Sequence, residues 1–194
     1  MNTYLLLAYI TGGLLIAYSL FLYIFPIRKL NLLLKAGADL ITIINLTFIY
    51  LYTNNALVLA SIATNCIGMV RVILFSFRND CKALDHIAWP IAFSIIFMLS
   101  LIFTYQTPLS LLPPIGSVIT TMCFYSTNQK VLKTGAIAAT AIYIVYYAIL
   151  LPSSDTLTMF ALLYTIAGFV SSVVGLIVIL IKEKHQEKIE ETNN

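Results

Sequence analysis

Two charged side chains, Asp39 and Arg71, lie inside apolar stretches that are long enough to cross a membrane. Placing a lone guanidinium in such a stretch costs at least about 2.5–3.5 kcal/mol, so Arg71 needs a partner. A rise of about 1.5 Å per residue puts the two side chains roughly 6 and 9 Å from the same end of neighbouring antiparallel helices. We therefore predict an intramembrane ion pair between Asp39 and Arg71, with Lys35 as a further partner. The alternative leaves Asp39 with Lys35 alone and lets Arg71 extend to lipid phosphates.

A second polar layer is expected near the middle of the membrane. Asn45 and Asn65 are each ten to twelve residues from the same end of their stretches, which is roughly 15–18 Å deep at that rise. An amide at this depth must find hydrogen-bond partners. Together with the hydroxyl groups of Tyr143, Tyr147 and Ser171, the two amides are candidate contacts for a small polar solute. Hydrogen bonding between helices, at about 0.6 kcal/mol per bond, is the alternative use of these groups.

Catalytic, metal and cofactor sites are not expected. His86 and His185 fall in a predicted loop and in the charged tail, and Asp39 is the only carboxylate inside an apolar stretch. This leaves no buried set of ligands for haem or a transition metal. The HExxH, GxSxG and P-loop patterns are absent from the sequence, so we do not predict an enzyme.

The composition is that of an integral membrane protein. Of the 194 residues, 60% are hydrophobic and 10% are charged, whereas soluble domains carry about 25% charged residues. Seven of the 19 charged residues are in the last thirteen positions, so the rest of the chain has too few to solvate a globular surface. The basic residues are spread along the chain rather than gathered in a patch, which excludes nucleic-acid binding.

Seven apolar stretches predict seven membrane-spanning helices, because about 20 residues are needed to cross the hydrocarbon of a bilayer. Prolines, paired asparagines and short charged runs separate them. Little chain is left for a folded domain outside the membrane. The predicted spans are residues 4–25, 33–52, 56–77, 87–105, 109–127, 134–151 and 156–181.

The cations predict an orientation. Ten of the eleven Lys and Arg residues fall in turns or near helix ends on one side of the seven-span arrangement, and the eleventh is Arg71. Lys and Arg close to helix ends are retained in the cytoplasm. We therefore expect the N-terminus outside and the C-terminus inside, with residues 182–194 forming a charged cytoplasmic tail.

Two similar halves are expected within this all-α membrane protein. Placing the first three spans on the last three, at an offset of roughly 100 residues, sets Lys29 near Lys130 and Gly68 near Gly168. One helix between the copies leaves both triplets in the same orientation. We predict a first three-helix bundle in residues 1–86, a linker helix in 87–108 and a second bundle in 109–181.

The stretch LLPPIGSVITTMCFYSTNQKVLK, from Leu111, and the stretch NCIGMVRVILFSFR around Arg71 resemble the YgjV-type family of bacterial inner-membrane proteins. That family is similar to the SWEET, semiSWEET and PQ-loop superfamily. The resemblance implies two parallel three-helix bundles joined by a linker helix, in the bacterial inner membrane. The PQ dipeptide is absent and the single tryptophan, Trp89, falls in the linker helix, which argues against sugar as the solute.

Two functions remain open from the sequence. The first is a facilitator, a uniporter of a small polar solute that is bound between the bundles and exposed alternately on each side. The second is a membrane scaffold or partner subunit without transport. The expected partners are the lipid bilayer and the small polar solute, and the sequence leaves the oligomeric state open.

Overall fold

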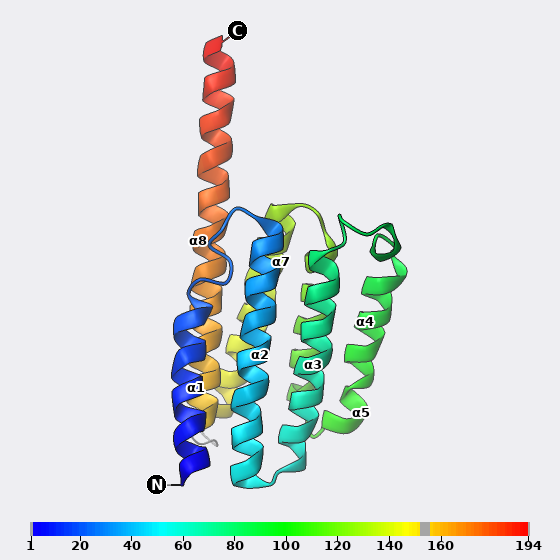
Figure 1. Ribbon diagram of the computed structural model, residues 1–194, viewed down its shortest axis with the longest axis vertical. Coiled ribbons are helices and arrows are strands. Elements are labelled where there is room, and N and C mark those ends of the chain that lie inside the picture. The colour runs from blue at the N-terminus through cyan, green and yellow to red at the C-terminus, as the bar shows by residue number, and fades with distance from the viewer. Residues whose placement is uncertain (1, 152–155, 194) are drawn as a thin grey trace.

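The computed structural model describes residues 2–151 and 156–193, and all regular elements in these ranges are helices (Figure 1). Five helical stretches, at Arg28–Thr53, Val58–Ser76, Pro108–Tyr125, Gln129–Leu150 and Thr158–Gln186, are long and apolar enough to cross a membrane, and two shorter apolar stretches are Thr3–Ser19 and Ala88–Thr104. The α-helices are α1 (Thr3–Ser19), α2 (Arg28–Thr53), α3 (Ala56–Ser76), α4 (Ala88–Leu99), α5 (Leu101–Thr104), α6 (Leu112–Tyr125), α7 (Gln129–Leu150) and α8 (Thr156–Asn193). Two 3-10 helices are η1 (Lys82–Leu84) and η2 (Pro108–Leu111).

Asparagines mark three of the helix ends. The side chain of Asn2 accepts a hydrogen bond from the Tyr4 amide at the start of α1, and that of Asn128 accepts one from the Lys130 amide at the start of α7. Such side chains satisfy amides that have no partner within the helix. Asn54 ends α2 with a φ of 52°, in the left-handed region that asparagine tolerates better than most residues. The expected break at this position is confirmed.

Two helices begin earlier than the apolar pattern predicts. α2 starts at Arg28 rather than at residue 33, and α7 starts at Gln129 rather than at residue 134. Their first turns carry polar and cationic side chains. Such residues are compatible with a helix, but they interrupt the apolar run from which the span was predicted.

One helix ends early. α1 stops at Ser19, whereas the predicted first span runs to residue 25. Residues 20–27 leave the helix although most of them are apolar. Side chains from α7 and α8 hold this segment in place, as described below.

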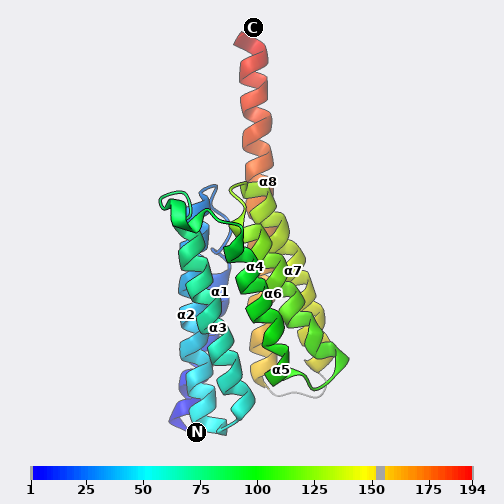
Figure 2. The same ribbon diagram turned by 90° about the vertical axis from the view of Figure 1, so that its right-hand side faces the viewer.

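The helices form two layers, which Figure 2 shows edge-on. In the first layer α2 packs between α1 and α3, and in the second α7 packs between α6 and α8. Contacts of α1 with α8 join the layers along one side. On the other side α4 packs against α6, and α3 touches α6 and α5.

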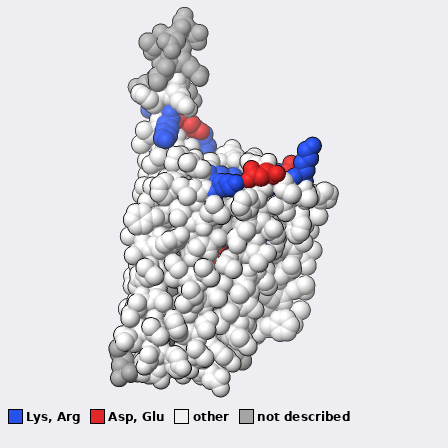
Figure 3. Space-filling view, in the orientation of Figure 1, with Lys and Arg blue, Asp and Glu red and all other residues white. Residues whose placement is uncertain are grey.

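Charged residues gather at one end of the molecule, from which α8 projects (Figure 3). We call this the basic end and define it by Lys29, Arg78 and Lys130, which lie at the first turns of α2 and α7 and just after α3. The buried core is concentrated in the same half. It contains the rings of Tyr23, Phe75 and other aromatic and aliphatic side chains, among them Leu22, Leu32, Val72, Phe93, Phe97, Phe124 and Leu132.

Candidate functional site

A cavity of about 590 Å³ lies between the two layers. This volume is within the range of roughly 300–1,000 Å³ that is usual for small-molecule sites. Four of the five predicted solute contacts line it: Asn45 and Asn65 from the first layer, and Tyr143 and Tyr147 from the second. The structure therefore brings together side chains that are up to about a hundred residues apart in the sequence.

The cavity is placed asymmetrically along the bundle. Its lining reaches Thr53, Ser110 and Thr158, which lie at the end opposite the basic end. Toward the basic end it stops at the level of Lys35 and Arg71, below the buried aromatic core. The cavity thus extends to one end of the molecule and is closed from the other.

The two asparagines make different contacts. The Asn45 amide nitrogen donates to the carbonyl of Ala8, at 2.7 Å, and to the hydroxyl of Thr11, at 2.8 Å, and so ties α2 to α1. The Asn65 amide nitrogen donates to the carbonyl of Ser61 in its own helix, at 2.8 Å. Hydrogen bonding between helices, the alternative use of these groups, is therefore present at Asn45, whereas the bond of Asn65 stays within its own helix. Both side chains also line the cavity.

Tyr143 is fixed against α6. Its hydroxyl donates to the carbonyl of Pro113, at 3.0 Å, and lies 2.8 Å from the Ser117 hydroxyl. A Cβ atom at Gly116 would be only 3.0 Å from the Tyr143 ring. The glycine therefore lets this tyrosine pack closely enough on α6 to reach both oxygen atoms.

Ser171, the fifth predicted contact, is not in the cavity lining among the described residues. Its side chain is buried, and its hydroxyl accepts a hydrogen bond of 2.8 Å from the backbone amide of Tyr23. The Tyr23 amide lies beyond the end of α1 and has no partner within the helix. The Ser171 hydroxyl takes the place of that partner.

The expected ion pair between Asp39 and Arg71 is absent. Asp39 pairs with Lys35, one turn earlier on α2, through its Oδ1 atom. Arg71 points to α6, where its Nη1 atom donates to the Ser117 carbonyl at 3.0 Å and to the Thr121 hydroxyl at 2.6 Å. Both residues line the cavity, but the sequence does not determine which neighbour each side chain faces.

Aromatic rings complete the surroundings of Arg71. Its Cζ atom is 4.9 Å from the centre of the Phe97 ring and 5.5 Å from that of Phe124. A guanidinium over an aromatic face is attracted by the ring quadrupole. The side chain is only 4% exposed, so Arg71 does not extend to lipid phosphates either.

The ion pair of Lys35 with Asp39 predicts that these two residues, rather than Asp39 and Arg71, are coupled in their effect on stability. Removing Lys35 and Asp39, singly and together, is expected to give an interaction free energy of about 1–3 kcal/mol, because the pair is largely buried. A double-mutant cycle for Asp39 and Arg71 is expected to give a smaller interaction free energy, since these residues share no hydrogen bond. Thermal unfolding in detergent of Lys35→Met, Asp39→Asn, Arg71→Met and the two double variants measures both. A larger coupling for Asp39 with Arg71 would contradict the geometry.

The basic end is closed by buried cations that bind carbonyl groups across the two layers. Lys133, on α7, is fully buried, and its ammonium group donates to the carbonyls of Tyr23 and Phe25 in the segment after α1. In return, Arg28, at the start of α2, donates to the carbonyl of Phe124, at 2.7 Å, and to that of Ser126, at 2.8 Å, at the end of α6.

These contacts are related by a constant shift along the sequence. Lys133 binds carbonyls 23 and 25, Arg28 binds carbonyls 124 and 126, and both carbonyls of the second pair are 101 positions after those of the first. The Tyr23 and Phe124 rings also meet, with centroids 6.1 Å apart. Each layer therefore contributes one cation that binds two carbonyls of the other layer, and the two carbonyl pairs occupy equivalent positions in the sequence.

Arg78 adds a further contact across the layers. It donates to the carbonyl of Tyr125 and pairs with Asp85 at 2.5 Å. By contrast, the exposed ion pairs of Lys29 with Asp80 and of Lys130 with Glu183, both at 2.6 Å, each stay within one layer. Exposed pairs of this kind contribute about 0–1 kcal/mol, so the buried cations dominate the closure.

The segment after α1 is irregular backbone packed beside an apolar stretch of α8. Tyr23 lies beside Gly175 of α8, which is seven residues, or about 10 Å, before Lys182. Such backbone is tolerated only where protein groups satisfy it. Here Ser171 and Lys133 supply the partners, and Asn31 adds a hydrogen bond of 2.8 Å to the Phe25 carbonyl.

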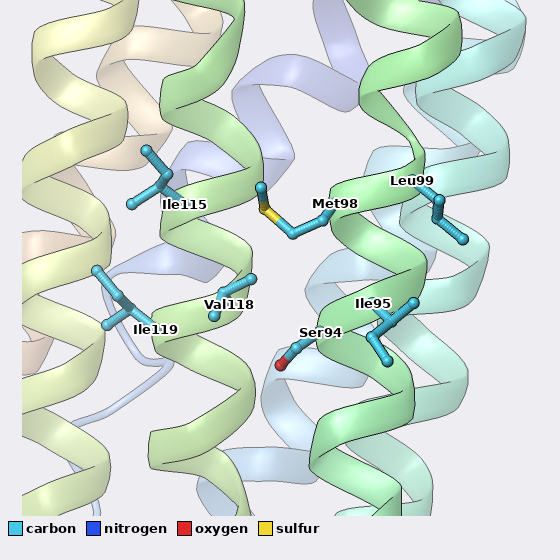
Figure 4. Close-up of a pocket in the computed structure, with 7 residues that line it drawn as sticks. All are labelled: Ser94, Ile95, Met98, Leu99, Ile115, Val118 and Ile119. Carbon is cyan, nitrogen blue, oxygen red and sulfur yellow. The ribbon is translucent and has the colours of Figure 1, made fainter.

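A second pocket, of about 370 Å³, lies between α4 and α6 (Figure 4). Aliphatic side chains and Met98 line it, and its one polar side chain, Ser94, donates to the Pro90 carbonyl of its own helix. Without a free polar group this pocket has the character of a surface covered by lipid chains rather than of a solute site.

Two cations lie deeper than expected from the sequence. Arg28 and Lys133 are expected in turns, but both are buried at the basic end. Lys35, expected one helical turn before Asp39, lines the cavity. A local signal was available for Lys133, because Asn128 is a strong helix-capping residue and places Lys133 more than one turn inside the helix.

No protein-family model, curated protein or solved structure matches this chain.

Proposed function

We propose that this protein is a membrane facilitator, a uniporter that moves a small polar solute by alternating access between its two helical layers. The observation that carries the proposal is the polar cavity between the layers, which extends to one end and is closed at the other by cations bound to carbonyl groups. A carrier needs a central site whose two ends can be closed in turn.

The 101-residue register supports a parallel repeat. Helices α1, α2 and α3 then correspond to α6, α7 and α8, with α4 and α5 as the linker between the triplets. In this proposal the two triplets are the parallel three-helix units implied by the resemblance to the SWEET-like superfamily. Rocking one unit against the other would break the reciprocal contacts of Arg28 and Lys133 together.

The basic end is proposed to face the cytoplasm of a bacterial inner membrane, since Lys and Arg near helix ends are retained there. The cavity then faces outward and the C-terminal part of α8 lies inside. Cys81 offers a test, because it is exposed at the basic end. A membrane-impermeant maleimide is expected to modify Cys81 in inside-out vesicles and to spare it in intact cells. The opposite pattern would reverse the orientation.

The scaffold alternative expects an interior that is packed shut. The cavity of about 590 Å³ favours transport over that alternative, because two buried atoms of its lining residues, the Nε of Arg71 and the Oδ2 of Asp39, have no hydrogen-bond partner among the described residues. Such groups are costly unless water or a solute satisfies them.

Uptake into proteoliposomes tests the proposal. Vesicles that contain the purified protein would be compared with protein-free vesicles for the entry of a mixture of small metabolites, measured by mass spectrometry. The proposal expects at least one polar solute to enter faster in the presence of the protein and without an imposed ion gradient. Equal entry of every solute would favour the scaffold role.

A further inference from the structure

The charged groups in the cavity restrict the chemistry of its solute. Among the described residues, three charged side chains line the cavity: Lys35, Asp39 and Arg71. Lys35 and Asp39 neutralise each other as an ion pair. No described carboxylate lies within 4 Å of the guanidinium of Arg71, so the lining carries one uncompensated positive charge.

Two polar atoms beside this charge have no partner. The Nε atom of Arg71 and the Oδ2 atom of Asp39 are buried and form no hydrogen bond with described residues. Both residues are only 4% exposed. A buried donor or acceptor without a partner keeps an uncompensated desolvation cost, so each of these atoms marks a place where a ligand gains affinity.

The two atoms belong to one region of the cavity. The Oδ2 atom of Asp39 is 3.9 Å from the position of a Cβ atom on Gly68, which also lines the cavity. Gly68 is three residues before Arg71 on α3, and residues three apart share one face of a helix. The unpartnered acceptor therefore lies against the same face of α3 that carries Arg71, about one turn away.

From this arrangement we infer that the cavity binds a small hydroxy acid or amino acid whose carboxylate neutralises Arg71 and whose hydroxyl or ammonium group donates to Asp39. The inference rests on the proposed function and names the solute class. Arginine suits a carboxylate because its planar donors match the two carboxylate oxygens. A purely cationic solute would be repelled by Lys35 and Arg71. A carboxylate solute that has no hydrogen-bond donor would leave the Oδ2 atom of Asp39 without a partner.

Binding to the purified full-length protein in detergent tests the inference separately from transport. The probes are L-lactate, L-alanine, propionate and 1,2-propanediol, which have similar sizes, with sodium chloride to match ionic strength. Lactate and alanine are expected to raise the unfolding temperature, in either order. Propionate, which lacks the donor, is expected to act more weakly, and propanediol, which lacks the carboxylate, is expected to have no effect. Stabilisation by propanediol equal to that by lactate, or no stabilisation by any carboxylate, would overturn the inference.

Variants locate the site. Arg71→Gln is expected to weaken lactate binding at least about tenfold, because a charge-assisted hydrogen bond is lost. Arg71→Lys should fall between it and the unchanged protein, since it retains the charge but not the planar donors. Lys29→Gln, which removes an exposed cation at the basic end, is the matched control and should bind normally. Unchanged binding in a folded Arg71→Gln variant would contradict the site, and if that variant does not fold, the probe series on the unchanged protein decides.

The two proposals fail in different ways. Carboxylate binding without uptake in proteoliposomes would remove the transport function and leave the binding site. Uptake of neutral solutes without carboxylate binding would leave transport and remove the inferred solute class.

Discussion

Replacing Gly175 with alanine is expected to destabilise the protein by about 3 kcal/mol, at the upper end of the usual range for overpacking a core. A Cβ atom at this position of α8 would overlap the backbone carbonyl of Tyr23 and approach the ammonium group of Lys133. The Tyr23 backbone cannot easily give way, because Ser171 and Lys133 bind its amide and its carbonyl. The midpoint of thermal unfolding in detergent measures the effect.

Gly13→Ala is the matched control, since it makes the same change in another helix. A Cβ atom at Gly13 would have no neighbour within 4 Å. Alanine favours the helix over glycine by up to about 1 kcal/mol, so this variant should be as stable as the unchanged protein or slightly more stable. Equal stability of Gly175→Ala and Gly13→Ala would show that the close approach of α8 to the Tyr23 backbone is absent.

Replacing Lys133 with methionine is expected to open the basic end. Methionine has a similar length but cannot donate, so the Tyr23 and Phe25 carbonyls lose the ammonium group that joins them to α7. Hydrogen bonds to charged groups are worth about 1.5–3 kcal/mol each. A net loss of about 3 kcal/mol from the closed form would raise the open population about 100-fold.

The measurement is the rate at which a thiol reagent added from the basic side modifies a cysteine placed at Thr42, in the cavity lining. Lys130→Met is the matched control, because Lys130 is exposed and pairs with Glu183 within its own layer. The rate should increase strongly with Lys133→Met and stay unchanged with Lys130→Met. An unchanged rate in both variants would mean that Lys133 does not hold the end closed.

The helices themselves follow well from the sequence. Apolar stretches and their polar breaks locate the five long and two shorter apolar helical stretches of the described residues, and asparagine caps explain several of their ends. These features are local, so they can be recognised without knowing which helices are neighbours. The early end of α1 could not be foreseen, because its partners Lys133 and Ser171 are more than a hundred residues away from Tyr23.

The sequence predicts how far along its helix each site residue lies, but not which neighbouring helix its side chain faces. Residue counting assigns Asp39 and Arg71 to one polar layer and Asn45 and Asn65 to another, and all four line the same cavity. It could not show that Arg71 faces α6 rather than α2, because the rotation of one helix against another depends on packing over the whole layer. Ser171 was misassigned for the same reason.

Buried cations were the hardest residues to interpret. A lysine near a helix end ordinarily marks the membrane surface, and Lys130 fits that rule. Lys133, only three residues further along α7, is fully buried on two carbonyls. The difference is created by the unwound segment after α1, which offers oxygen atoms that a regular helix would have used itself.

The central claim is that the two layers open alternately around the cavity. Measuring whether the cavity is accessible from each side of the membrane tests this claim most directly. The protein would carry Thr42→Cys, with Cys66, Cys81 and Cys123 replaced by alanine, and a membrane-impermeant thiol reagent would be added to one side at a time. Thr42 suits this purpose because, within the described part of the chain, its hydroxyl bonds only to the Ala38 carbonyl of its own helix. A cysteine at Ile44, which is 41% exposed on the outer surface of the same helix, is the control.

Alternating access predicts fast modification of position 42 from the side opposite the basic end and slower but complete modification from the basic side. The control at position 44 should stay unmodified from both sides, because lipid covers it. Lasting protection of position 42 from the basic side, or from both sides, would contradict the account.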